Sequence, residues 1–223
     1  MSADAYLEGV LPLVRRLGEG EARSSILEAG QAIARCLSDG RKVWVAQTSH
    51  CLHTEATYRA GGLIAVHILE DAVLVRPGDC VIEGTPVGTS SLAIDTALEA
   101  KTRGATLIAL TNVAFEEDPR TRLEHPSGSR LSEIADIVVD VAGPFGDGMF
   151  MTTIPGENVI PHSGVTEMVA MWMIFSEAMT QMQQEQKAPR FYECIMIEGA
   201  TARNHEQLDE YATTNLGYRD LWA

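Results

Sequence analysis

Hydrophobic residues along the chain follow two kinds of spacing. Over residues 4–17 and 21–38 they recur at helical spacing, with a break at Gly18 to Gly20. Short apolar runs elsewhere predict buried strands at 42–46, 63–69, 81–82, 106–110 and 136–141. Helical segments fill the gaps between these runs. The alternation predicts an α/β fold, a three-layer α/β/α sandwich around a doubly wound parallel sheet.

The remaining segments complete this outline. A helix is expected over 50–60, and the polar segment 112–130 is expected to be an ordered loop. Residues 165–186 predict a long helix whose first half is apolar nearly all round, which is typical of burial against the core or a partner subunit. We expect an extended segment at 192–197 and a last helix at 203–213.

Hydroxyl-rich segments follow two of the predicted strands. Residues 47–53 and 84–91 lie at the carboxyl ends of strands, where doubly wound sheets bind their ligands. In the second segment a helix begins, and its free N–H groups with the adjacent hydroxyls suit an anion such as phosphate. Ser and Thr are also favoured there as caps and turn residues, so a purely structural role is the alternative. The candidate ligand contacts are Thr85, Gly88, Thr89, Ser90 and Ser91, joined by Ser49 from the first segment.

Composition narrows the function classes. A net charge of −14 disfavours nucleic acid and anionic membranes as partners, and mainly indicates solubility. The N-terminus shows no signal peptide, and no apolar stretch approaches the roughly 20 residues of a membrane helix. Four scattered cysteines predict reduced thiols and a cytoplasmic protein. These are Cys36, Cys51, Cys80 and Cys194.

Three runs of sequence carry a resemblance to a known family. They are YRAGG at 58–62, ALEAK–RGA–IALT within 97–111, and HPSG leading to GPFGD within 125–147. On these residues the chain resembles the sugar isomerase (SIS) domain family, in its stand-alone phosphosugar isomerase subgroup related to phosphoheptose isomerase. The resemblance covers residues 20–180 and, more loosely, the tail. It implies a three-layer domain, a homodimer or homotetramer, ligand sites near subunit interfaces, and isomerisation or binding of sugar phosphates.

Three departures from the family pattern concern the phosphate. The family turn commonly reads Ser-x-Ser-Gly-x-Ser/Thr/Asn, whereas Val87 stands here in place of the second serine. Glu83, just before the turn, adds a negative charge that would repel phosphate at close range. The first turn, at 46–50, also lacks the glycines of the family. Whether the ligand is phosphorylated therefore stays open.

The resemblance also supplies catalytic candidates. A glutamate on the helix after the first strand often acts as the base in this family, and Glu55 lies in the matching segment. A carboxylate suits the transfer of a proton between neighbouring carbons, although an ordinary exposed glutamate is the alternative. His50, or His205 from the terminal helix of the same or a neighbouring subunit, is expected to assist.

Further histidines are candidate metal ligands or ligand contacts. His50 and His53 lie three apart and share a helix face, so together with Glu83 they could hold zinc, as in some phosphoheptose isomerases. No cofactor is otherwise required. His125 and Ser127 lie on a polar loop and are candidate ligand or interface contacts. The start of the long helix, with His162, Ser163 and Glu167, fits a helix cap as well as a site.

The sequence thus predicts one SIS domain over 1–223, with N-terminal helices in 1–40 and a C-terminal extension over 188–223 that packs on the core or a partner subunit. The leading function is aldose–ketose isomerisation of a phosphosugar by proton transfer. The alternatives are a non-catalytic sugar-phosphate-binding regulatory protein, and a metal-dependent isomerase or lyase of a non-phosphorylated sugar. The expected partners are a small sugar or sugar phosphate and further copies of the chain.

Overall fold

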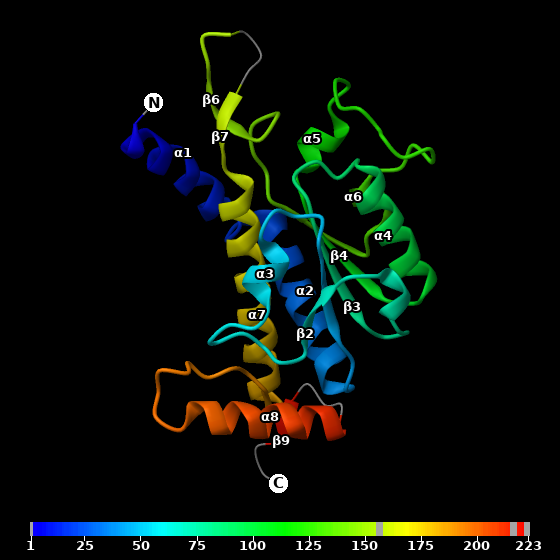
Figure 1. The fold of residues 1–223 in the computed structure, drawn as a ribbon. Coiled ribbons are helices and arrows are strands. Elements are labelled where there is room, and N and C mark those ends of the chain that lie inside the picture. Colours follow the sequence, from blue (N-terminus) through cyan, green and yellow to red (C-terminus); the bar gives the residue numbers. More distant parts are fainter. Residues whose placement is uncertain (1, 155–157, 215–217, 221–223) are drawn as a thin grey trace.

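A five-stranded parallel sheet forms the centre of the molecule (Figure 1). The computed structural model describes residues 2–154, 158–214 and 218–220. The strands lie in the order β2-β1-β3-β4-β5. Their bounds are Val43–Ala46 (β1), Val66–Leu69 (β2), Cys80–Gly84 (β3), Thr106–Thr111 (β4) and Ile137–Asp140 (β5). The predicted α/β class and parallel sheet are confirmed.

Helices cover both faces of the sheet, giving the predicted three layers (Figure 1). One face packs against α2 (Gly20–Ser38) and α7 (Ser163–Gln184), and the other against α4 (Ser91–Thr102) and α6 (Leu131–Ile134). Successive strand residues point to opposite faces, so β1 sends Val43 and Val45 into the first core and Trp44 into the second. Because both faces are covered, the strands are continuously apolar.

The strand order creates a switch point between β1 and β3. The chain leaves β1 toward β2 on one side and later returns to β3 on the other, where Val45 lies beside Ile82. Ligands of such sheets bind outside the carboxyl ends of the strands at this point. Both hydroxyl-rich segments predicted from the sequence begin there.

Two predicted segments in the first 130 residues differ from the structure. The helix expected over 50–60 is only α3 (Leu52–Ala56), because Thr57 is extended (φ −119°) and Tyr58 takes a left-handed conformation (φ 53°). The loop expected over 112–130 begins with α5 (Val113–Glu117), which Asn112 caps by accepting a hydrogen bond from the Phe115 N–H at 3.2 Å.

The ends of the chain add smaller elements. α1 (Ala3–Arg16) lies beside a hairpin of β6 (Gly148–Met151) and β7 (Asn158–Pro161), and a 3₁₀ turn η1 (Ala72–Leu74) follows β2. The segment expected to be extended at 192–197 forms no named strand, and its residues 195–197 form a turn and a bend. β8 (Lys187–Pro189) precedes it and pairs with β9 (Tyr218–Asp220). Helix α8 (Ala200–Thr214) is bound to β2 by a 2.8 Å hydrogen bond between His67 and Tyr211. None of the described helices could cross a membrane.

Candidate active site at the carboxyl edge of the sheet

Glu83 is a fully buried carboxyl at the end of β3. Its Oε1 accepts a hydrogen bond from the Thr48 hydroxyl, which follows β1. Its Oε2 is also shielded from solvent and has no hydrogen-bond partner among the described residues. A buried polar atom without a partner is costly, and such atoms concentrate at functional sites.

A second buried carboxyl, that of Glu167, reaches the same edge from α7. Its Oε2 accepts a 2.6 Å hydrogen bond from the Ser49 hydroxyl, while Oε1 lacks a partner in the described part of the chain. Gly84 makes this approach possible, because a Cβ there would overlap Leu52 and come within 3.4 Å of Glu167 Oε2. The structure therefore brings together Ser49, Glu83 and Glu167 from three separate segments.

The pKa of Glu83 is raised to about 8, mainly by burial, with the Thr48 hydrogen bond opposing the shift and the nearby Glu167 adding to it. The pKa of Glu167 is also raised to about 8, mainly by burial, with the Ser49 hydrogen bond opposing the shift and Asp147 adding to it. With a pKa of about 8, each carboxyl is mostly protonated at neutral pH. A neutral Glu83 does not repel phosphate, which removes the objection based on its charge.

His162 and Asp147 lie next to this pair at the start of α7. Asp147 accepts hydrogen bonds from the Ser163 N–H (3.0 Å) and hydroxyl (2.9 Å), so Asp147 caps the helix rather than Ser163. His162 is fully buried, and its Nε2 lies 3.4 Å from Asp147 without a hydrogen bond to any described residue. Burial lowers the pKa of His162, and Asp147 opposes that shift. The imidazole is therefore neutral near pH 7.

The predicted turn at 84–91 is tightly built. Ser90 caps α4 by accepting from the Ala93 N–H at 3.4 Å, and Thr85 accepts from the Val87 N–H at 3.3 Å. Gly88 has φ 59°, and a Cβ on it would overlap the Glu116 carboxyl. That carboxyl is buried, and Thr111 and Ser132 donate hydrogen bonds to it.

A pocket of about 260 Å³ opens beside Thr48, between the ends of β1 and β2 and the start of α4. Its size is close to the lower end of small-molecule sites. Thr48 lines this pocket and also donates a hydrogen bond to the buried Glu83. The lining residues are Ala46, Gln47, Thr48, Leu69, Glu70, Ala72, Leu92 and Thr96.

The predicted base and its neighbours on α3 are placed differently. Glu55 is half-buried and forms an ion pair with Arg59, one turn further on. His50 precedes the helix and is exposed, whereas the Nδ1 atom of His53 is buried with no partner among the described residues. These side chains lie on the segment next to Ser49, but no hydrogen bond joins any of the three to Glu83 or Glu167 in the described residues.

Other predicted residues lie elsewhere. His125 shares a 2.7 Å hydrogen bond with Ser127 and a 3.1 Å contact with Asp95 of α4. His205 is exposed on α8, at the opposite end of the molecule from α5 and the β6–β7 hairpin (Figure 1). Because α5 follows the carboxyl end of β4, His205 does not join the sheet edge of its own chain.

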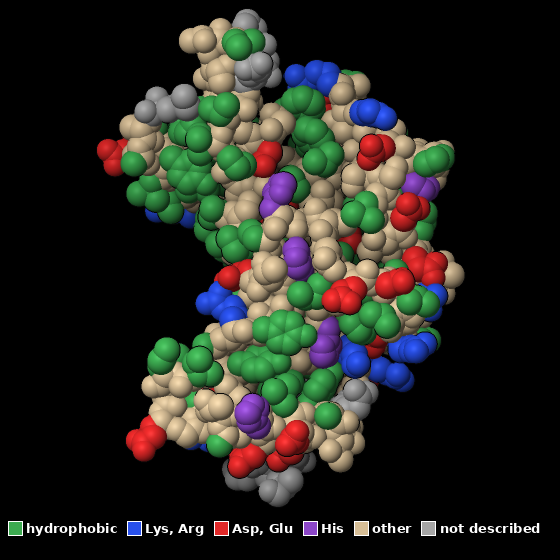
Figure 2. Space-filling view, in the orientation of Figure 1, with side chains coloured by type: hydrophobic (Ala, Val, Ile, Leu, Met, Phe, Trp, Pro, Cys, Tyr) green, Lys and Arg blue, Asp and Glu red, His purple; other side chains and the backbone are tan. Residues whose placement is uncertain are grey.

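The predicted zinc ligands do not come together. Within the described residues, no three side chains of His, Cys, Asp or Glu lie close enough to hold a metal ion, so His50, His53 and Glu83 form no such group. Histidines are spread over the visible face rather than gathered in one place (Figure 2). The short α3 and the position of Glu83 inside the sheet account for this separation.

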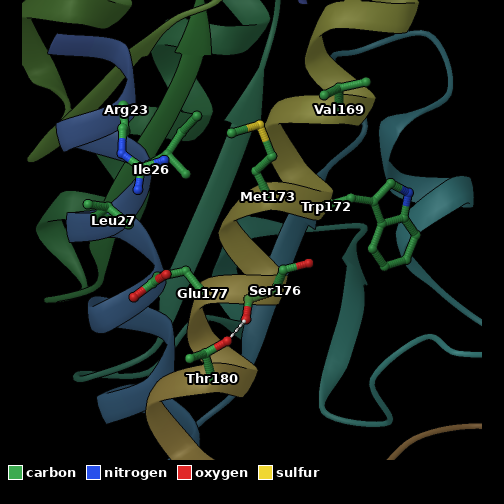
Figure 3. Close-up of a pocket in the computed structure, with 9 residues that line it drawn as sticks. All are labelled: Arg23, Ile26, Leu27, Val169, Trp172, Met173, Ser176, Glu177 and Thr180. Atoms are coloured by element: carbon green, nitrogen blue, oxygen red, sulfur yellow. Dashed lines mark hydrogen bonds between the residues drawn. The ribbon is translucent and has the colours of Figure 1, made fainter. Parts of the chain in front are cut away.

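A groove of about 390 Å³ between α2 and α7 lies apart from these residues. Ile26 and Leu27 of α2 face Val169 and Met173 of α7 across it, with Arg23 and Glu177 at its sides (Figure 3). This lining is mainly apolar and lacks the convergent polar groups that orient a sugar. The buried carboxyls without hydrogen-bond partners and the pocket beside Thr48 make the sheet edge the candidate active site.

Sequence patterns could not show which carboxyls lie at the candidate active site. Glu167 lies in the first turns of the long helix, where the sequence fitted a helix cap as well as a site. Glu116 lies in a segment expected to be a loop. Both reach the edge through contacts distant in sequence, with Ser49 for Glu167 and Ser132 for Glu116.

Comparisons with solved structures support the fold, and a sequence comparison finds relatives of similar length. No protein-family model matches the chain. A UPF0309 protein of Listeria monocytogenes serotype 4b is 28% identical over 235 residues, covering 92% of this chain and 94% of its own. The structure of phosphoheptose isomerase from Neisseria gonorrhoeae is 15% identical with a TM-score of 0.52, covering 78% and 93%. The NanR protein of Vibrio vulnificus, solved in complex with ManNAc-6P, is 13% identical with a TM-score of 0.50, covering 95% and 66%.

Proposed function

We propose that this chain, which has the sugar isomerase (SIS) fold, interconverts the aldose and ketose forms of a sugar phosphate. The observation that supports this most directly is the pair of buried carboxyls, Glu83 and Glu167, each with a pKa of about 8 and one oxygen without a described partner. Isomerisation needs a base and an acid that exchange protons near neutral pH. Two neighbouring carboxyls can supply both.

In the proposed reaction, one carboxyl of the pair reacts in the minor fraction that is ionised near neutral pH, and this carboxylate takes the proton from the carbon next to the sugar's carbonyl group. The protonated carboxyl donates to the carbonyl oxygen, which gives an enediol. Return of a proton to the former carbonyl carbon, and loss of one from the neighbouring hydroxyl, gives the ketose without net change in protons or electrons. Substrate would enter from the pocket past Thr48, and Ser49 would orient Glu167.

The turn after β3 is the proposed contact for the rest of the substrate. Thr85, Thr89 and Ser90 would bind sugar hydroxyls or phosphate. Glu55 stays as the alternative base, with His50 or His205 of a second subunit as its partner. No step in this proposal requires a metal.

Three substitutions test the assignment. We expect Glu83→Gln and Glu167→Gln each to lower kcat at least about 100-fold, the scale of general acid–base catalysis, while substrate binding persists. Glu117→Gln, on the surface of α5, is the matched control. Turnover is followed by aldose-to-ketose conversion over a panel of sugar phosphates. Loss of activity in Glu55→Gln alone would move the base to Glu55, and no conversion of any sugar phosphate would refute the reaction.

A non-catalytic sugar-phosphate-binding protein is the second candidate. The NanR protein, which was solved in complex with ManNAc-6P, supports it because its fold is similar. The shielding of both carboxyls from solvent also fits a protein that binds without turnover. A rise in melting temperature with sugar phosphates, without conversion of any of them, would favour this function.

A further inference from the structure

A pocket of about 310 Å³ lies at the opposite edge of the sheet from the candidate active site. It is formed by the start of β1, by η1 and by the loop that leads into β3, so it lies at the amino ends of these strands. It shares no lining residue with the pocket beside Thr48. Its volume is that of a small-molecule site. The lining residues include Arg41, Lys42, Trp44, Leu74, Arg76 and Asp79.

Three cationic side chains of this pocket form no ion pair. Arg41 and Arg76 are exposed and Lys42 is half-buried, and none of them pairs with an Asp or Glu in the part of the chain that the structure describes. The chain has 31 acidic but only 17 basic residues, so carboxylates are abundant enough to pair with every cation. Like charges gathered in one pocket repel each other, and an anionic ligand would remove that repulsion.

Asp79, the acidic residue among the lining, is engaged by other donors. It is 2% exposed, and its carboxylate accepts hydrogen bonds from the Trp44 Nε1–H (2.8 Å) and from the backbone N–H groups of Lys42 (3.1 Å) and Arg76 (2.9 Å). These neutral donors leave the charged ends of Lys42 and Arg76 available to a ligand. Three cations and one carboxylate give the pocket two net positive charges, and a concave site of one charge sign attracts the opposite sign.

We propose that this pocket binds a small organic dianion, a phosphate monoester or a dicarboxylate, whose apolar part contacts Leu74 and Trp44. Two guanidinium groups and one ammonium group suit the charge of such a ligand, and guanidinium groups donate paired hydrogen bonds to either kind of anion. Leu74 is 43% exposed, and the Lys42 Nζ lies 5.5 Å from the centre of the Trp44 ring. Apolar surface therefore adjoins the cations. The proposal is independent of the isomerisation at the other edge of the sheet.

Direct binding tests this without turnover. AMP, phthalate and uncharged adenosine are titrated calorimetrically into wild type, Arg41→Gln/Arg76→Gln and a charge-matched control, Arg15→Gln/Arg122→Gln. The control removes two exposed arginines, of α1 and of the loop after α5. We expect wild type to bind at least one dianion and not adenosine. The pocket variant should bind that dianion at least about tenfold more weakly, because two charge-assisted contacts are lost. The control should match wild type.

The two dianions distinguish the ligand classes, since binding of AMP alone identifies a phosphate monoester and binding of phthalate alone a dicarboxylate. Circular dichroism of each variant verifies that the fold is intact. Four results would overturn the proposal: no binding of either dianion by wild type, adenosine binding as tight as that of AMP, an unchanged affinity in Arg41→Gln/Arg76→Gln, or an equal loss in the control. An unchanged affinity in the pocket variant would place the anion at another site, such as the turn after β3.

Discussion

The carboxyls of Glu83 and Glu167 retain protons that an unfolded chain releases. Their ordinary pKa is 4.5, and burial raises each to about 8 in the folded chain. Between these values the folded state binds more protons than the unfolded state. Stability should therefore fall as pH rises through this window, and level off above pH 8.

This dependence can be measured by urea unfolding at pH 5, 6, 7 and 8. Each carboxyl should lower the free energy of unfolding by up to about 1.4 kcal/mol per pH unit. The Glu83→Gln/Glu167→Gln variant, neutral at every pH, should lose this contribution, whereas Glu117→Gln should keep it. A wild type and double variant with parallel pH profiles would show that the two carboxyls ionise normally.

Gly88 gives a second prediction at the residue scale. Gly88→Ala places a methyl group against the Glu116 carboxyl at a left-handed position (φ 59°), so we expect a loss of about 2–4 kcal/mol in unfolding free energy. Gly128 has a similar φ of 68° but open space around it. Gly128→Ala should therefore lose only about 1–2 kcal/mol, the backbone part. Equal losses in the two variants would mean that the Glu116 carboxyl moves away from the new methyl group at no cost in unfolding free energy.

At the scale of elements, the pairing of α2 with α7 carries much of one core. Phe175 of α7 is 2% exposed and lies in the core, whereas Met173 lines the groove of Figure 3. We expect Phe175→Ala to lower the free energy of unfolding by about 3–5 kcal/mol, and Met173→Ala by clearly less, because only the former leaves a closed cavity. Urea unfolding at one pH measures both. A larger loss for Met173→Ala would place the core on the other side of α7.

The elements also show what sequence patterns could resolve. Apolar runs in the sequence predicted all five strands of the sheet, because strands buried on both faces are continuously apolar. The alternation of strands and helices then predicted the fold. α3 and α5 were mispredicted because their ends depend on single residues, Tyr58 with positive φ and the capping Asn112. Only part of the candidate site could be predicted from the sequence. Ser49 and Glu83 lie beside turn motifs, whereas Glu167 reaches them through tertiary packing.

On the scale of the whole molecule, α1 and the β6–β7 hairpin form an apolar surface. They are joined by a 3.0 Å hydrogen bond from the Tyr6 hydroxyl to the Pro161 carbonyl. Figure 2 shows hydrophobic side chains gathered over α1. Contiguous exposed apolar residues commonly mark an interface. The exposed members are Leu7, Leu11, Met151, Ile154 and Ile160.

We therefore expect this surface to carry the proposed association of the chain with itself. Leu7→Glu/Leu11→Glu should shift the protein from dimer or tetramer to monomer in light scattering after size exclusion. Leu98→Glu, which charges a partly exposed leucine of α4 outside this surface, should leave the assembly unchanged. A monomeric wild type would refute self-association, and an assembly that survives the double substitution would place the interface elsewhere.

The two protons on Glu83 and Glu167 have a thermodynamic consequence for any ligand that reaches them. A ligand that ionises either carboxyl transfers a proton to the buffer, so the heat measured on binding includes the buffer's own heat of protonation. Titrations of one ligand in buffers with different ionisation enthalpies would then give different apparent binding enthalpies, and their slope counts the protons released. A ligand bound only at the outer turn would give the same enthalpy in every buffer. The dependence of the binding enthalpy on the buffer therefore shows whether a ligand reaches the buried carboxyls at the sheet edge.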